Sequence, residues 1–185
     1  LVATRSAVFL AGDGVDDLEV FDVVVEVGAE GQFHAEELLH ADEKVGVFDQ
    51  SSFAKYELTG ADALKALDWI CANDINKPVG RLTYTQLLNT RGGIEADLTV
   101  ARLAEEKFYI VTGTGFRTHD FAWIADHAGK DLDVTLTDVT EDFGTLSLMG
   151  PRARDVLAEV TDADVSNAGF PFGHVREIVL TVKNT

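Results

Sequence analysis

The sequence predicts an α+β protein built from two related β-α-β halves with antiparallel sheets. Two observations predict this architecture: an internal repeat between the middle and the end of the chain, and a β-hairpin pattern between Leu82 and Leu103. The length of 185 residues and the hydrophobic content of 46% suffice to bury a sizeable core. Mean hydropathy is +0.05, and no apolar run approaches the roughly 20 residues that a membrane-spanning helix needs. We therefore expect a soluble protein without a membrane partner.

The first 43 residues have the weakest pattern of the chain. Between Ala7 and Val25, two apolar runs, SAVFLAG and VFDVVVEVG, flank the acidic segment GDGVDD, which predicts two strands around a turn. The residues from Glu36 to Glu43 predict a helix. A secretory signal is not indicated, because the apolar piece is short and acidic residues follow it immediately.

The internal repeat becomes visible when the two helix starts are aligned. FAKYELTGADALKALDWICANDI (Phe53 to Ile75) matches FGTLSLMGPRARDVLAEVTDADV (Phe143 to Val165) at constant spacing, and each copy reads as a strand, a glycine, a helix and an acidic turn. The matched positions are Gly60 with Gly150, Ala63 with Ala153, Leu67 with Leu157 and Asp74 with Asp164. Pro151 suits a first helical turn, where its missing N–H costs nothing. Two β-α-β halves of ferredoxin-like type follow from this repeat.

The hairpin pattern lies between the two copies. Leu82 to Leu88 alternates as a strand, Asn89-Thr90-Arg91-Gly92-Gly93 supplies a flexible loop, and Ile94 to Leu103 alternates again. Glu95, Asp97, Thr99 and Ala101 are then expected on one face of the second strand, because side chains alternate with period two. Asp97 on such a small, polar face, opposite the strand that carries Tyr84, could bind a nitrogen-rich ligand. The alternative is an exposed strand aspartate on a solvated face.

A second glycine-containing segment resembles a dinucleotide loop only superficially. Thr112-Gly113-Thr114-Gly115 follows a strand at Phe108 to Val111 and precedes a helix from about Thr118 to His127. No third glycine has the required spacing, and Asp120 in the first helical turn would repel a phosphate. We therefore expect a plain strand-to-helix turn, with Thr118 as a helix cap.

Charge and the rarer residue types exclude several classes of function. The net charge is −17, from 32 acidic and 15 basic residues, which opposes nucleic acid and anionic membranes as partners. The single cysteine, Cys71, excludes an intrachain disulfide and shares a helical stripe with Leu64, Leu67 and Ile70, so we expect it in the core. The five histidines have no metal-ligand spacing, so we expect no metal. Aromatic residues including Trp69 are expected mainly in the core.

Three segments carry a resemblance to a known family. VGVFDQSSFAKYELTG (Val45 to Gly60), ANDINKPVGRLTYTQLLNTRGGIEADLTV (Ala72 to Val100) and SLMGPRARDVL (Ser147 to Leu157) resemble the folate-binding domain of the glycine-cleavage aminomethyltransferases. The strongest resemblance is to the C-terminal region of dimethylglycine and sarcosine dehydrogenases. It implies a partial domain of this type over residues 44–185, preceded by a segment, residues 1–43, of unassigned fold.

The resemblance also implies site residues and chemistry. Asp97 matches the aspartate that contacts the pterin and amine region of tetrahydrofolate, so it is the expected catalytic residue. Tyr84, Val111 and Gly113 match positions that line or border the folate pocket. The implied reaction transfers a one-carbon unit to tetrahydrofolate and forms 5,10-methylenetetrahydrofolate. A non-catalytic folate-binding or scaffold module, and a free-standing glycine-cleavage aminomethyltransferase, are the alternatives.

The family pattern is incomplete in this chain. The Tyr-Thr-Gly-Glu type motif, the later helices, the C-terminal barrel and the upstream FAD domain of the dehydrogenases are absent, and the repeat ends one strand after its second helix. We therefore expect a truncated fragment, in which the edge of Val175 to Val182 is unpaired. FAD would belong only to a missing part of the parent protein. The expected compartment is the cytoplasm, or the mitochondrial matrix if the source is eukaryotic.

Overall fold

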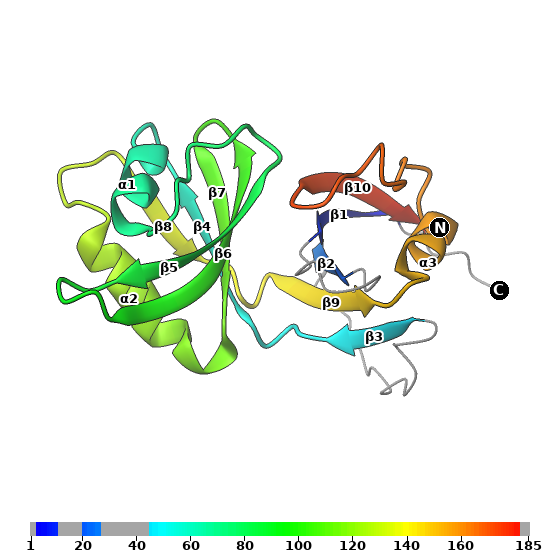
Figure 1. The fold of residues 1–185 in the computed structure, drawn as a ribbon, viewed down its shortest axis with the longest axis horizontal. Helices are drawn as coiled ribbons and strands as arrows, with labels where there is room; N and C mark the ends of the chain where they lie inside the picture. The colour runs from blue at the N-terminus through cyan, green and yellow to red at the C-terminus, as the bar shows by residue number, and fades with distance from the viewer. Residues whose placement is uncertain (1–2, 11–19, 27–44, 182–185) are drawn as a thin grey trace. The chain divides into compact units, whose positions relative to one another are not determined.

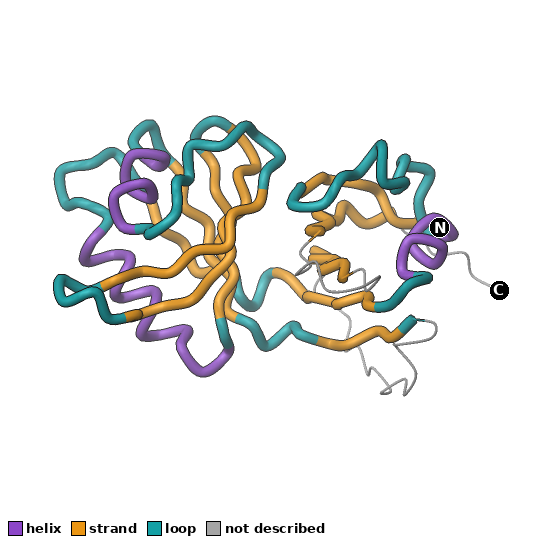
Figure 2. Tube along the Cα trace, viewed as in Figure 1, coloured by secondary structure: helices purple, strands orange, loops and turns teal. Residues whose placement is uncertain are grey.

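The computed structural model describes residues 3–10, 20–26 and 45–181, and the chain forms two compact units (Figure 1). Unit 1 contains Leu1–Ser52 and Glu141–Thr185, and unit 2 contains Phe53–Thr140. Unit 1 is thus made from both ends of the chain, and unit 2 from its middle. Figure 2 shows that strands dominate the described part of each unit.

Unit 2 is a five-stranded antiparallel sheet with two helices. The strand order is β5-β6-β7-β4-β8. The strands are β4 (Ala54–Thr59), β5 (Leu82–Leu88), β6 (Ile94–Ala104), β7 (Lys107–Thr112) and β8 (Thr135–Asp138). The helices are α1 (Ala63–Ile70) and α2 (Arg117–His127), the latter preceded by a 3-10 turn, η1 (Thr114–Phe116). The predicted strand at Leu82–Leu88 is confirmed, and the second hairpin strand begins at Ile94 as expected.

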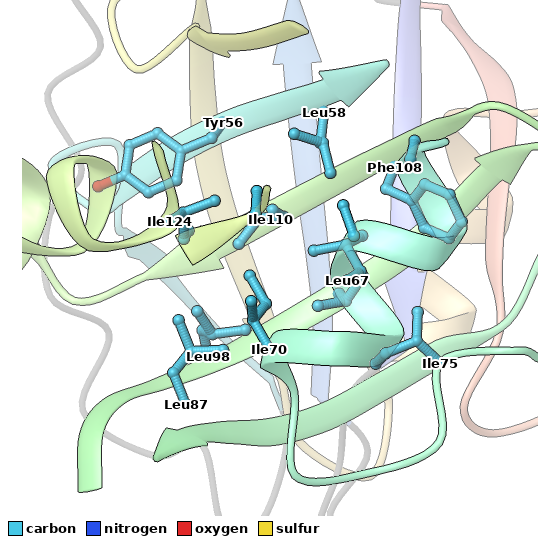
Figure 3. Packing of buried hydrophobic residues seen from close by; sticks show 14 of the residues in the cluster. Tyr56, Leu58, Leu67, Ile70, Ile75, Leu87, Leu98, Phe108, Ile110 and Ile124 are labelled. Atoms are coloured by element: carbon cyan, nitrogen blue, oxygen red, sulfur yellow. The ribbon is translucent and has the colours of Figure 1, made fainter. Parts of the chain in front are cut away.

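The core of unit 2 lies between the sheet and its helices (Figure 3). Alternate residues of β4 and β6 are buried on this side, because side chains on a strand point to opposite faces in turn. The buried strand residues include Tyr56, Leu58, Leu87, Leu98, Phe108 and Ile110. Helix α1 contributes Leu67 and Ile70, and α2 contributes Ile124. The apolar face of this sheet is therefore covered by both helices.

Helix α1 places one predicted core residue outside. Its buried positions are Ala63, Ala66, Leu67 and Ile70, which share one face at helical spacing. Trp69 follows Leu67 by two positions and so points to the opposite side, where it is 82% exposed. The expectation that Trp69 belongs to the core is wrong. Cys71, the C-cap of α1, packs against the core cluster as expected.

Helix α2 begins differently from the expectation. It starts at Arg117, its N-cap is Phe116, and no side chain caps it by a hydrogen bond. The prediction of Thr118 as the cap is therefore wrong, because η1 leads directly into the helix. Asp120 lies in the first turn, as the sequence indicates.

Unit 1 has the same strand arrangement, assembled from the two ends of the chain. Its antiparallel sheet has the order β10-β1-β2-β9-β3. The elements are β1 (Ala3–Leu10), β2 (Val20–Glu26), β3 (Gly46–Asp49), β9 (Phe143–Met149), α3 (Ala153–Glu159) and β10 (Val175–Thr181). The two predicted N-terminal strands are confirmed; the turn between them and the helix expected from Glu36 lie outside the described residues.

The pairing of the N-terminal strand β1 contradicts the expectation of an unpaired edge at Val175 to Val182. β10 pairs with β1 over its whole length, from Val175 opposite Phe9 to Thr181 opposite Ala3. The edge expected to be unpaired after the second helix is therefore occupied, because β1 takes the position that β6 takes in unit 2. Sequence continuity does not matter to a strand ladder, since backbone N–H and C=O groups pair equally well with a distant segment.

The repeat extends to the turns that precede β4 and β9. Asp49 accepts a hydrogen bond on Oδ1 from the Ser51 N–H at 2.9 Å, and Asp138 accepts one on Oδ1 from the Thr140 N–H, also at 2.9 Å. Each is an Asx turn at the end of the outer strand of its sheet.

A side chain of each turn also accepts a hydrogen bond from the neighbouring strand of the same sheet. The Ser51 Oγ accepts a hydrogen bond from the Thr145 N–H at 3.1 Å, and the Thr140 Oγ1 accepts one from the Lys55 N–H at 3.0 Å. The predicted duplication is thus present at the level of individual hydrogen bonds. The chain passes between the units at these turns: from β3 of unit 1 to β4 of unit 2, and from β8 of unit 2 to β9 of unit 1.

Candidate functional site

The candidate site begins with a hydrogen bond across the β5–β6 hairpin. In the ladder, Gln86 lies opposite Asp97 and Tyr84 lies opposite Thr99, so Tyr84 is the diagonal neighbour of Asp97. The Tyr84 hydroxyl donates to Asp97 Oδ2 at 2.6 Å. The structure thus joins two residues that the sequence predicts as site residues.

The site lies on the sheet face opposite the core of unit 2. Ala96 and Leu98 are 5% and 3% exposed and pack in the core, whereas Asp97 between them is exposed. The predicted alternation is confirmed around Asp97. Tyr84 is 58% exposed on the neighbouring strand, so both polar groups are accessible to a ligand.

The other two predicted residues lie at the end of the adjacent strand β7 and just after it. Val111 of β7 lies opposite Thr99, and Thr112 lies opposite Leu98, the last pair of this ladder. Gly113 follows directly, with an extended backbone at φ −65° and ψ 143°, and leads into η1. Val111 therefore lies near the end of β7 and Gly113 just beyond it, next to the strand that carries Asp97.

The structure also reveals a buried carboxylate beside this region that the sequence analysis did not assign to the site. Asp120 is 0% exposed; its Oδ2 accepts a hydrogen bond from the Thr112 hydroxyl at 2.6 Å, and its Oδ1 lies 2.9 Å from His119 Nδ1. His119 Nε2 lies 3.7 Å from Glu95 Oε2. No sequence signal reveals this cluster, because its members come from three separate elements.

Two buried tyrosines of unit 2 remain protonated at neutral pH. Burial raises the pKa of Tyr56, and the carboxylates of Asp120 and Asp138 raise it further; its hydroxyl donates to the Arg117 carbonyl at 2.6 Å. Burial also raises the pKa of Tyr109, with a smaller contribution from Glu57. These phenols can therefore donate hydrogen bonds but supply no charge.

The part of the chain that the structure describes contains no group of three or more metal-ligating side chains. Within the same residues, no helix is both long and apolar enough to cross a membrane.

The fold and the site together define a class of protein: a duplicated antiparallel α+β domain with an accessible carboxylate on an inner strand of one sheet. The GCVT N-terminal domain family matches residues 17–184. The chain belongs to this family, and the match includes the whole of β2 and the segment after it, where the sequence alone shows no family motif.

Several proteins are similar to the chain. Mouse (Mus musculus) mitochondrial sarcosine dehydrogenase is 41% identical over 140 residues, which are 68% of this chain and 15% of that protein. The mitochondrial pyruvate dehydrogenase phosphatase regulatory subunit of the same species is 38% identical over 144 residues, 77% of this chain and 16% of that protein. Dimethylglycine dehydrogenases and bacterial aminomethyltransferases also match. The chain thus spans about one sixth of the length of these mitochondrial relatives.

A solved structure supports the fold. The glycine cleavage system aminomethyltransferase T from Bartonella henselae superposes with a TM-score of 0.65 at 27% identity. The superposition covers 77% of this chain and 43% of that chain. The predicted aminomethyltransferase-type α+β fold is confirmed.

Proposed function

We propose that this chain binds tetrahydrofolate through Asp97 and Tyr84 and serves as the one-carbon transfer domain of a larger protein. The observation that carries the proposal is the 2.6 Å hydrogen bond from the Tyr84 hydroxyl to Asp97 Oδ2 on an accessible sheet face. It fixes one carboxylate oxygen and therefore orients the whole group. Among the described residues, no side chain donates to the other oxygen, which leaves it available to a ligand N–H.

The residues present fit such a ligand. The pterin ring and its amino groups offer N–H donors, and a carboxylate is an acceptor with two oxygens. A hydrogen bond between an N–H and a carboxylate is charge-assisted, so it is stronger than a neutral one. Val111 of the adjacent strand offers an apolar side chain, and Gly113 after that strand offers backbone without a Cβ. We assign them to the border of the pocket.

When bound, tetrahydrofolate supplies the nucleophilic nitrogen that accepts the one-carbon unit and becomes 5,10-methylenetetrahydrofolate. The protein needs little covalent chemistry for this transfer. Asp97 orients the ligand nitrogen and stabilises positive charge that develops there. Tyr84 holds Asp97 in position. The binding sites for the amine donor, sarcosine or dimethylglycine, and for the FAD that would oxidise it are assigned to other parts of the parent polypeptide.

One relative supports a second candidate. The phosphatase regulatory subunit is named for regulation and not for catalysis, and it is about as similar to the chain as the dehydrogenase. A non-catalytic folate-binding or scaffold module is therefore the alternative, and a free-standing aminomethyltransferase is a further one. For a eukaryotic parent we propose the mitochondrial matrix, because the relatives are named as mitochondrial proteins.

Calorimetry with tetrahydrofolate tests the binding proposal on this chain, on Asp97→Asn and on Asp126→Asn. Asp126 is an exposed aspartate of α2, so its substitution controls for the loss of one negative charge. We expect saturable binding by the parent chain and by Asp126→Asn. Asp97→Asn should bind about 10- to 100-fold more weakly, the usual effect of losing a hydrogen bond to a charged group.

Absence of binding by the folded parent chain would contradict a folate site formed by these residues alone. Formation of 5,10-methylenetetrahydrofolate distinguishes a one-carbon transfer domain from a non-catalytic folate-binding module. A parent protein that converts sarcosine or dimethylglycine should yield 5,10-methylenetetrahydrofolate when the domain is catalytic, and should bind tetrahydrofolate without forming it when the domain is a binding module.

A further inference from the structure

The cluster around Asp120 has features that the fold alone does not require. A carboxylate in the first turn of a helix is stabilised by the helix dipole even when it is exposed. Asp120 is instead 0% exposed, and burial of a carboxylate costs free energy unless hydrogen bonds replace its water. Thr112 of β7 supplies one such bond, and His119 is placed to supply the other. Both partners are held close to the candidate site.

The first link to the site runs through Thr112. Its Oγ1 lies 2.6 Å from Asp120 Oδ2 and 3.4 Å from the backbone carbonyl oxygen of Asp97. The hydroxyl has a single hydrogen, which the shorter contact places on the bond to Asp120. Asp120 therefore fixes the rotamer of a side chain that lies against the backbone of Asp97.

The second link runs through His119 to Glu95. The ladder pairs Leu87 with Ala96 and Leu88 with Ile94, so Glu95 is the extra residue of a β-bulge. A bulge redirects a side chain out of the regular alternation. Glu95 Oε1 accepts a hydrogen bond from the Asn89 side chain at 2.7 Å, and Glu95 Oε2 lies 3.7 Å from His119 Nε2.

His119 thus stands between two carboxylates from different elements. Its Nδ1 faces Asp120 of α2 and its Nε2 faces Glu95 of β6. Its side chain is 49% exposed, whereas that of Asp120 is 1% exposed. Nδ1 is within hydrogen-bonding distance of Asp120 at 2.9 Å, whereas the 3.7 Å between Nε2 and Glu95 Oε2 is too long for a hydrogen bond and is an electrostatic contact. The ring therefore links α2 to β6 through Asp120 and Glu95.

We propose that Asp120 and His119 are positioning residues that hold the Asp97 segment of β6 in place against α2. The network contacts β6 at two residues, the side chain of the bulge residue Glu95 and the backbone carbonyl of Asp97. The effect of this network on ligand binding rests on the proposed function, but the coupling of His119 to Asp97 does not. Neither residue touches the ligand in this arrangement.

The coupling is tested by NMR on the full 185-residue chain. Amide chemical shifts of Ala96, Asp97 and Leu98 are compared between the parent chain, His119→Gln and His127→Gln. We expect His119→Gln to change the shifts of these amides. His127→Gln should leave them unchanged, since the described contacts of the His127 ring are with Trp123 of its own helix. Unchanged amide shifts in His119→Gln would overturn the proposal.

Tetrahydrofolate binding gives an independent measurement. We expect His119→Gln, checked for folding by circular dichroism, to bind about three- to tenfold more weakly than the parent chain, the range typical of coupling between sites. His127→Gln should bind like the parent chain. Equal affinity of His119→Gln and the parent chain would refute the positioning role and leave the proposed function intact. Failure of the parent chain to bind would refute the proposed function, and the NMR comparison of the variants would still decide whether His119 positions Asp97.

Discussion

Gly60 and Gly150 have the same left-handed backbone, with φ of 128° and 127°, at the same step of the two β-α repeats. Each glycine carbonyl accepts a hydrogen bond at 3.0 Å from the N–H of the alanine that begins the next helix, Ala63 or Ala153. The glycine thus allows the tight turn from strand to helix in each repeat, since residues with a Cβ rarely adopt this conformation.

Substitution of Gly60 should be severely destabilising. A Cβ at this position would lie 2.1 Å from the Asp133 carbonyl oxygen, in addition to the backbone strain. We expect Gly60→Ala to lower the free energy of unfolding by more than about 3 kcal/mol, above the usual strain of a non-glycine residue in such a conformation. Gly92→Ala is the matched control, because Gly92 has φ of 78° and no atom within 4 Å of its added Cβ. Urea denaturation measures both, and equal losses would contradict the steric explanation.

The two faces of α1 should differ sharply in their response to truncation. Leu67 is 1% exposed and Trp69 is 82% exposed. Leu67→Ala should cost about 2–5 kcal/mol, because it removes buried methyl groups and leaves a cavity. Trp69→Ser should change stability by no more than about 0.5 kcal/mol. Chemical denaturation followed by circular dichroism measures both; a large loss for Trp69→Ser would mean that its side chain is covered.

Tyr84→Phe should weaken ligand binding with little effect on folding. The substitution removes only the hydroxyl that holds Asp97, and Tyr84 is 58% exposed, so the stability change should stay below about 1 kcal/mol. Calorimetry should show tetrahydrofolate affinity reduced about three- to tenfold, consistent with one lost hydrogen bond. Since Tyr84 acts through Asp97, the same substitution in an Asp97→Asn background should have little further effect. Additive losses would mean that Tyr84 contacts the ligand independently.

Cys71 should resist alkylation in the folded protein. Burial, with a smaller contribution from Asp68, raises the pKa of its thiol to about 12, and only the thiolate reacts. Iodoacetamide at pH 8 should therefore label Cys71 slowly in buffer and rapidly in urea. The raised folded-state pKa also means that the contribution of Cys71 to stability is complete below the unfolded pKa and is lost as the pH rises through the folded pKa. Rapid labelling of the native chain would contradict this assignment.

Asp138 should contribute to stability above acidic pH. Burial alone would raise its pKa, but hydrogen bonds from Arg117 and Thr140 and the charge of Arg117 outweigh burial and hold the pKa below its usual range. A depressed folded pKa stabilises the protein above the unfolded value of about 3.9, and this contribution is lost as the pH falls through the folded pKa. The melting temperature of Asp138→Asn should therefore lie below that of the parent chain at pH 7 and approach it near pH 2. A constant difference across this range would exclude ionisation of Asp138 as the cause.

Much of unit 2 could be predicted from residues that are close in sequence. The period-two alternation at Leu82–Leu88 and around Asp97, and the repeated glycine before each helix, depend on local backbone geometry. Trp69 shows the limit of this reasoning: aromatic composition suggested burial, whereas its position on α1 relative to Leu67 required exposure. The buried Asp120 could not be predicted, because its partners Thr112 and His119 are brought to it only by the packing of α2 on the sheet.

The sequence by itself determined that the chain contains two β-α repeats and strands near both of its termini. It also determined that the carboxylate of Asp97 lies on the strand face opposite Ala96 and Leu98. Only the tertiary structure decided that β1 pairs with β10, that Tyr84 reaches Asp97, and that His119 lies between Asp120 and Glu95. The physical reason is that side-chain periodicity specifies which face of a strand is buried. The choice of a neighbouring strand depends on backbone hydrogen bonds that any segment can make, and it is settled only when the whole chain packs.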